Sequence, residues 1–350
     1  MTIPQPGRPR KGPKQAILAL LKKRRSVPAR ALREHLRISR QALSLHVREL
    51  IRSGKLVRSG STRGAQYSLA RRAPVPVTRR SLLSLPDLDE SKAYEQLKAV
   101  LNLRSQLKPN VEAILHYALT EMLNNAIEHS EASRAELQLR LEHAAVGFEL
   151  REHGIGVFHS IASKLGLEDE QAALVELLKG KTTTMRERHT GEGIFFTSRV
   201  ADRFVLRSHR IRLEWNRFKN DVFVSQQRFL AGTLVDFLIE RHSRQRLEQV
   251  FSEFAPAEYD YRFLKTRVFV KLLQAEYVSR SEAKRLLANL ETFREVVIDF
   301  KDVRTIGQAF ADEIFRVFRA AHPELKLLTK NANDVVDAML RHVRDSGPRA

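Results

Sequence analysis

The side chains best suited to chemistry stand inside an apolar, helix-forming segment, VEAILHYALTEMLNNAIEHS, residues 111–130. Glu121 and Asn125 are four residues apart, so a helix places them on one face, with Glu128 and His129 beside them. Leucine, methionine and alanine residues fall on the opposite side. This polar stripe is either the solvated face of an amphipathic helix or one wall of a site, and the segment alone does not decide between them.

A second polar segment, REHGIGVF at residues 151–158, follows a strand-like stretch and carries Glu152, Gly154 and Gly156. Glycines let a backbone approach a ligand closely. No glycine follows at position 159, so the segment is not a dinucleotide-binding fingerprint. A tight turn explains the same residues equally well.

Two further segments follow along the chain. Residues 177–202 form a polar stretch that leads into a helix-like run, and they include Lys181, Thr182, Thr183, Gly191, Glu192 and Gly193. Position 175 is valine, so the Gly-Lys-Thr sequence does not complete a P-loop. Amides at a helix N-terminus nevertheless favour phosphate. The last segment, AGTLVDFLIE, predicts a strand that contains Thr233.

The order and spacing of the four segments resemble the GHKL ATPase superfamily, which includes gyrase, the heat-shock chaperone ATPase, mismatch-repair ATPases, histidine kinases and anti-sigma kinases. The resemblance covers roughly residues 90–240. The family's E-x-x-x-N box matches Glu121 and Asn125. Its D-x-G-x-G box, its G-x-G lid box and its late threonine match Glu152, Gly154, Gly156, Gly191, Gly193 and Thr233. The resemblance implies a Bergerat-type α/β sandwich.

The resemblance also implies roles for these residues, with ATP and Mg²⁺ as cofactors. Asn125 supplies an oxygen to Mg²⁺, and Glu121 orients and deprotonates the attacking water or hydroxyl. Glu152 accepts the adenine amino group with support from Thr233. The phosphates meet the amides of Gly191, Glu192 and Gly193, and the lid holds Lys181, Thr182 and Thr183. Glu152 replaces the family's aspartate and has a longer side chain. Its carboxylate must therefore fold back, or the adenine base must shift.

The first 80 residues carry nearly all the excess charge, with 21 lysines and arginines and two acids. This balance predicts a polyanion as partner. Residues 14–23, 28–36 and 40–54 read as helices, and residues 55–60 and 65–70 as two short strands. We therefore expect residues 1–70 to form a domain that resembles the winged helix-turn-helix of bacterial regulators.

In a winged helix the second helix of the motif enters the major groove of double-stranded DNA. Its outward positions would be Arg40, Gln41, Ser44, Leu45 and Arg48. Arg58 and Arg63, on the wing, would contact phosphate or the minor groove. One winged helix reads only a half-site, so we expect a homodimer. A winged helix used for protein contacts is the alternative.

Beyond a Pro- and Arg-rich linker at residues 71–84 and the ATPase-like domain at 85–245, residues 257–346 alternate strand and helix and predict a small α/β layer. Ser279 and Glu282 form a capping box for its first helix. The layer resembles STAS-like modules, which bind protein partners. Thr305 lies near the family's phosphoacceptor position, but the Asp-Ser pair is missing. A generic α/β interaction module is the alternative.

The fold class expected is therefore a multidomain α+β protein: a winged helix-turn-helix, a GHKL domain and a STAS-like domain. The chain has no cysteine, no signal peptide and no membrane span, which suits a cytoplasmic protein. The architecture resembles a bacterial family of ATP-binding regulators. It predicts a DNA-binding regulator switched by ATP. An anti-sigma-type protein serine/threonine kinase and a non-hydrolysing ATP-binding scaffold remain as alternatives.

Overall fold

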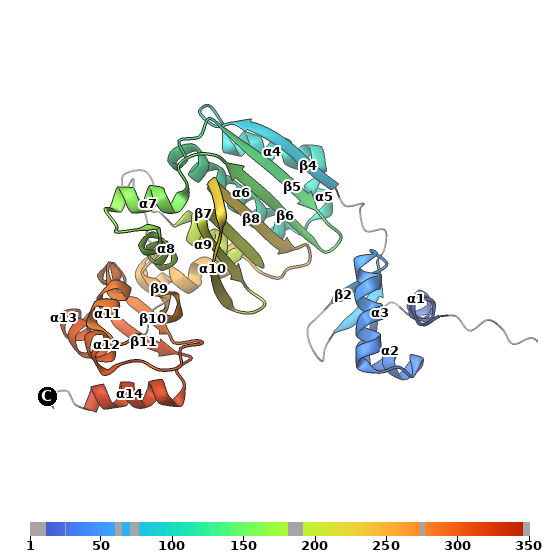
Figure 1. The fold of residues 1–350 in the computed structure, drawn as a ribbon. Coiled ribbons are helices and arrows are strands. Elements are labelled where there is room, and N and C mark those ends of the chain that lie inside the picture. Colours follow the sequence, from blue (N-terminus) through green and yellow to red (C-terminus); the bar gives the residue numbers. More distant parts are fainter. Residues whose placement is uncertain are drawn as a thin grey trace, which may run out of the picture. The chain divides into compact units, whose positions relative to one another are not determined.

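The computed structural model describes residues 12–24, 26–59, 65–70, 77–180, 192–273 and 277–345 (Figure 1). The chain divides into two compact units. One contains Met1–Val77 with Leu141–Ala144, and the other contains Thr78–Arg140 with Ala145–Ala350. Five residues singled out in the sequence lie outside the described residues: Arg63, Lys181, Thr182, Thr183 and Gly191.

The N-terminal unit contains three helices and a small antiparallel sheet. The helices are α1 (Pro13–Lys23), α2 (Ala29–Leu36) and α3 (Arg40–Arg52), and the sheet order is β1 (Val27–Pro28), β3 (Gln66–Leu69), β2 (Leu56–Ser59). Its core includes Ile17, Leu32, Val47 and Leu50. The side chain of Ser39 accepts a hydrogen bond from the Ala42 amide, which confirms the predicted start of α3.

A five-stranded sheet forms one layer of the central domain, residues 77–254. Its order is β4 (Val77–Ser84), β5 (Arg134–Leu141), β6 (Ala145–Glu152), β8 (Asp221–Glu240) and β7 (Arg203–Asn216). Strands β6 and β7 both pair with β8 in antiparallel fashion.

Residues 77–84 were expected to end the linker, and instead they form the edge strand β4. An edge strand needs a backbone partner on one side only and tolerates charged residues. Leu82 is exposed, and the Arg80 guanidinium donates to the Gln138 side chain on β5 at 3.1 Å. The linker prediction is therefore wrong for these eight residues; the two arginines that suggested a linker, Arg79 and Arg80, are exposed on this edge strand.

Helices supply the second layer of the central domain. Helix α6 (Pro109–His129) packs on β6 and β8, and α4 (Glu90–Leu101) and α5 (Leu103–Gln106) pack on α6. Leu115, Leu119, Met122 and Ala126 of α6 are buried, as the helical pattern predicted. Four shorter helices complete the domain: α7 (Val157–Leu165), α8 (Glu170–Lys179), α9 (Gly193–Val200) and α10 (Leu247–Phe254). Of these, α9 and α10 pack on α6.

The C-terminal domain, residues 257–345, is a three-stranded parallel sheet with helices. The strand order is β11 (Lys326–Lys330), β10 (Glu295–Asp299), β9 (Lys265–Phe269). Its helices are α11 (Arg280–Leu287), α12 (Gln308–Asp312), which continues through a π-helical turn (Glu313–Phe318) into α13 (Arg319–Ala321), and α14 (Asp334–Asp345). The alternation of strands and helices and the Ser279–Glu282 capping box match the sequence prediction.

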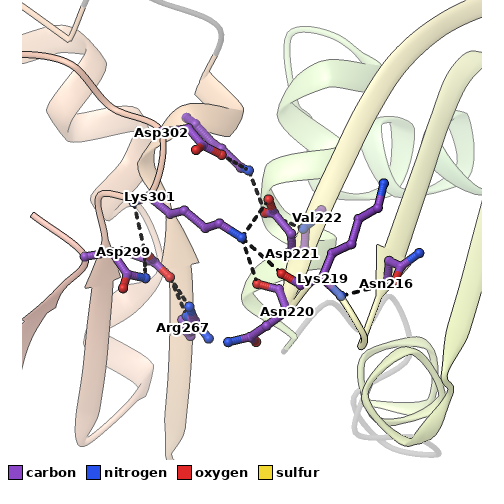
Figure 2. A network of polar contacts seen from close by, with 11 residues as sticks. Asn216, Lys219, Asn220, Asp221, Val222, Arg267, Asp299, Lys301 and Asp302 are labelled. Atoms are coloured by element: carbon purple, nitrogen blue, oxygen red, sulfur yellow. Dashed lines mark hydrogen bonds and ion pairs between the residues drawn. The ribbon is translucent and has the colours of Figure 1, made fainter. Parts of the chain in front are cut away.

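A polar contact, which we call the Asp221 clamp, joins the central and C-terminal domains (Figure 2). Asp221 begins β8, and its carboxylate accepts from Lys271 at 2.5 Å and from Lys301 at 2.9 Å. Lys301 also donates to the carbonyls of Lys219 and Asn220. The side chain of Asp221 is 6% exposed, so the start of β8 packs against the C-terminal domain.

Over the residues that the structure describes, no helix combines the length and the apolar character needed to cross a membrane.

Candidate functional site

A cavity of about 320 Å³ opens between α6, the sheet and the helices α7 to α10. Its size is in the range of small-molecule sites. It gathers residues from all four polar segments of the sequence: Glu121, Asn125, Glu152, Glu192, Gly193 and Thr233. Segments more than a hundred residues apart in the chain therefore meet around one space.

Helix α6 forms the polar wall of the cavity. The side-chain NH₂ of Asn125 donates to the Glu121 carbonyl at 2.9 Å. The Oδ1 atom of Asn125 can therefore accept a hydrogen bond or bind a cation. Asn124, Glu128 and His129 line the same wall. The polar stripe of this helix thus faces a cavity and not open solvent.

Glu152 lies at the end of β6 and is 4% exposed. In the β6–β8 ladder it stands directly opposite Thr233. Its Oε2 accepts from the Gly154 amide at 2.5 Å, so the carboxylate folds back over the turn. Thr233 Oγ1 accepts from the Val157 amide at 3.0 Å. The two residues expected to act together are therefore neighbours, and the longer side chain takes the folded-back arrangement.

The glycines of the loop after β6 allow close backbone packing. A Cβ on Gly154 would lie 1.8 Å from the Ser130 carbonyl oxygen, at the C-terminal end of α6. Gly156 has φ +82°, and a Cβ there would lie 2.5 Å from Ser208 Oγ. A side chain at either position would push the loop away. Gly154 therefore lets the loop after β6 lie against the end of α6, and Gly156 lets the same loop lie against β7.

The N-terminus of α9 faces α6 across the cavity. A Cβ on Gly193 would lie 2.1 Å from Glu121 Oε2, so this glycine lets the carboxylate approach the first turn of α9. Tyr117 also lines this region, and burial, together with the charges of Glu121 and Glu192, raises the pKa of its phenol. Tyr117 stays protonated and can donate a hydrogen bond near the two carboxylates.

The sequence did not identify the aromatic side of the cavity. Phe251 of α10 stacks on Phe196 with ring centroids 4.3 Å apart, and Tyr117 meets Phe251 edge-on at 5.5 Å. All three residues line the cavity. Helix α10 lies beyond the predicted boundary at residue 245. The apolar spacing of Val250, Phe251 and Phe254 in LEQVFSEF predicts a helix with one buried face, but it does not indicate the domain on which that helix packs.

In the N-terminal unit, the residues expected to contact DNA share one surface of α3. Arg40, Gln41 and Arg48 are exposed, and Ser44 is half-buried and accepts from the Arg48 guanidinium at 3.0 Å. Leu45 is 64% exposed on the same surface. Arg58 on β2 is also exposed. Apart from Arg63, which lies outside the described residues, and the half-buried Ser44, the predicted set is therefore open to solvent.

The cavity contains oxygen donors of the kind that bind Mg²⁺. Within the described ranges, no group of three or more His, Cys, Asp or Glu side chains could hold a metal by itself. Mg²⁺ rarely needs such a cage, because it takes one or two protein oxygens together with phosphate oxygens and waters. Asn125 Oδ1 and the neighbouring Glu121 carboxylate are oxygen donors of this kind. The residues fit Mg²⁺ that arrives with a phosphate ligand.

Comparison with known proteins agrees with the geometry of the central and C-terminal domains. Residues 85–215 match the model of the histidine kinase-like ATPase domain. Residues 282–337 match the STAS-like domain of unknown function (DUF4325). No curated protein matches the chain. Neither match includes residues 1–84. The chain therefore carries a histidine kinase-like ATPase domain followed by a C-terminal STAS-like domain.

Proposed function

We propose that the central domain binds Mg-ATP in the cavity between α6 and the sheet. The observation that carries this proposal is that Glu121, Asn125, Glu152, Gly193 and Thr233 line one cavity. Glu152 accepts the adenine amino group, and Thr233 supports the turn beside it through Val157. Asn125 Oδ1 holds the metal, which neutralises phosphate charge when it is bound.

Glu121 is the proposed catalytic base. Its carboxylate lies against the first turn of α9 and near the Tyr117 hydroxyl, where a phosphate end would meet the helix amides. A carboxylate in this place can orient and deprotonate either a water or a hydroxyl. The geometry therefore supports ATP hydrolysis and phosphoryl transfer equally.

We further propose that the N-terminal unit is a winged helix that binds double-stranded DNA as part of a homodimer. Three helices with a small antiparallel sheet, an exposed Arg/Gln surface on α3 and the excess of basic residues support this proposal. ATP binding in the central domain would then alter the arrangement of two winged helices on their half-sites, which makes the protein an ATP-switched regulator.

A protein kinase of the anti-sigma type is the second candidate, and the C-terminal domain favours it. A STAS-like domain suggests protein interaction, so this domain would bind the protein partner. Thr305 is exposed before α12, but the Asp-Ser pair of the phosphorylated relatives is missing here. The hydroxyl to be phosphorylated would therefore belong to a partner protein.

Incubation with ATP labelled at the γ-phosphate separates the two chemistries. Hydrolysis releases free phosphate, whereas kinase activity labels a protein. Both signals should fall at least a hundredfold in Glu121→Gln if Glu121 is the base. A Glu121→Gln variant with unchanged turnover would mean that the measured activity does not come from this cavity, and would favour a non-hydrolysing scaffold.

The DNA proposal is tested separately, by measuring the affinity for double-stranded DNA with and without Mg-ATP at one fixed salt concentration. The salt must be fixed because phosphate contacts make affinity salt-dependent. We expect the affinity or the footprint to change with ATP. Equal affinities and identical footprints would reject the coupling, and no binding at low salt would reject the DNA partner.

A further inference from the structure

The last residue of α8, Lys179, is held by the C-terminal domain. Lys179 is 2% exposed, and its ammonium donates to the Glu176 carboxylate at 2.6 Å and to the Ala288 carbonyl at 2.6 Å. Ala288 is the C-terminal cap residue of α11. The C-terminal end of a helix favours a cation, because its last carbonyls are not used within the helix. One buried ammonium therefore connects the two domains.

Two more hydrogen bonds complete this contact, which we call the Lys179 joint. The Asn289 side-chain amide donates to the other oxygen of Glu176 at 3.0 Å. The Thr266 hydroxyl of β9 donates to the Lys179 carbonyl at 2.7 Å. Glu176 is thus bonded on one oxygen by its own helix and on the other by the C-terminal domain. A buried charged pair keeps its place only when its remaining donors and acceptors are satisfied in this way.

The Lys179 joint is adjacent to the cavity. Leu177, between the two charged residues, lines the cavity. Gly180 follows the joint with φ +100°, and a Cβ there would lie 2.6 Å from the Phe195 ring and 2.7 Å from the Phe263 ring. Phe195 also lines the cavity, and its ring centroid is 4.7 Å from that of Phe263. The α8 and α9 walls of the cavity therefore pack against the C-terminal domain, to which Phe263 belongs.

We propose that Lys179 is a positioning residue for the nucleotide cavity, which fixes the α8 wall against α11 so that the C-terminal domain sets nucleotide affinity. This inference rests on the proposed Mg-ATP site. It makes the C-terminal domain part of the binding unit, although, among the described residues that line the cavity, none comes from that domain. A protein partner that shifts α11 would then change nucleotide binding through Lys179.

The Asp221 clamp offers a matched control (Figure 2). It joins the same two domains through a buried acid and two lysines, and neither Asp221 nor Lys271 nor Lys301 lines the cavity. Lys301→Met therefore removes a lysine from the domain contact without touching a cavity wall, whereas Lys179→Met removes a lysine next to the cavity.

The test is a fluorescence titration of the full chain with a trinitrophenyl ATP analogue and Mg²⁺, well below the melting temperature of each variant. We expect Lys179→Met and Asn289→Ala to raise Kd at least tenfold, and Lys301→Met to change it less than twofold. Lys179→Arg, which keeps the charge and can still donate to the Ala288 carbonyl, should recover most of the affinity. Equal Kd values for wild type and Lys179→Met, or equal losses in Lys179→Met and Lys301→Met, would overturn the proposal.

Hydrogen exchange supplies a readout that needs no nucleotide. Loss of the Lys179 joint should raise amide exchange together in residues 170–179 and 280–287, and Lys301→Met should leave both unchanged. A rise in only one of the two helices would overturn the joint. If the wild type binds no nucleotide, the proposed function fails, and exchange still decides whether the joint exists. If Lys179→Met does not fold, Asn289→Ala carries both measurements.

Discussion

Replacement of Glu152 by glutamine should change which base the cavity accepts. The Glu152 carboxylate uses one oxygen on the Gly154 amide, and its other oxygen can accept from an adenine amino group. A glutamine that keeps its oxygen on Gly154 presents its NH₂ to the cavity. That group cannot accept from adenine, but it can donate to the O6 carbonyl of guanine. Glu152→Gln should therefore weaken ATP binding and strengthen GTP binding relative to ATP.

The size of the effect follows from the bond that is lost. A hydrogen bond to a buried charged group contributes about 1.5–3 kcal/mol. Since about 1.4 kcal/mol is a tenfold change in Kd, ATP affinity should fall roughly 10- to 150-fold. Glu152 is 4% exposed, so solvent does not replace the lost acceptor.

The assay is calorimetric titration of wild type and Glu152→Gln with ATP and with GTP, each with Mg²⁺. Glu149→Gln is the matched control, since Glu149 lies on the same strand, pairs with Arg140 and is absent from the cavity lining. An ATP affinity within twofold of wild type, or a loss of equal size for both nucleotides, would refute the assignment of Glu152 to the base.

Three other predictions follow from local geometry. Gly154→Ala should abolish nucleotide binding and lower the melting temperature, because its Cβ would meet a backbone oxygen at 1.8 Å; an unchanged melting curve would contradict this. If Arg48 contacts phosphate, Arg48→Ala should weaken binding to all DNA sequences and reduce the steepness of log K against log salt by about 1. If Arg48 reads a base, the variant should weaken binding to the preferred sequence only. Burial raises the pKa of Asp221, but hydrogen bonds from Lys271 and Lys301 outweigh it and hold that pKa below its usual value. Its contribution to the free energy of unfolding is therefore full above about pH 4 and is lost as pH falls through the folded-state pKa. Asp221→Asn should lower the free energy of unfolding by about 1–3 kcal/mol at pH 7. In urea unfolding this free energy should also depend less on pH in the acid range than it does in wild type; an identical pH dependence would count against the clamp.

Sequence periodicity predicted most of the secondary structure where local signals were strong. The N-cap at Ser39, the capping box at Ser279 and the strand–helix alternation of the C-terminal domain match the elements observed. These signals are local, because they depend on hydrogen bonds within one turn or on the spacing of apolar residues. Strand β4 was missed because its pairing with β5 is a long-range contact that charged residues do not reveal.

The cavity was predicted in part. The motif order brought Glu121, Glu152 and Thr233 together, and the β6–β8 ladder does place Glu152 opposite Thr233. Phe251 was missed because an aromatic residue on the apolar face of an amphipathic helix is normally interpreted as a core residue. Its place in the cavity depends on how α10 packs on α6 and α9, which no local pattern specifies.

The link between domains could not be predicted from the sequence. Lys179 and Asn289 are 110 positions apart, and each alone reads as an ordinary surface residue. Only the packing of α8 on β9 and α11 makes them buried partners. Asp221 and Lys301 meet for the same reason, 80 positions apart.

The central claim is that Mg²⁺ and ATP bind together at Asn125. The most direct measurement is calorimetric titration of the full chain with a non-hydrolysable ATP analogue, with Mg²⁺ and with EDTA, for wild type and Asn125→Ala. We predict saturable binding to wild type that needs Mg²⁺, and at least tenfold weaker binding to Asn125→Ala. Binding to wild type that is absent under both conditions, or an Asn125→Ala variant that binds as tightly and with the same Mg²⁺ requirement, would contradict the account.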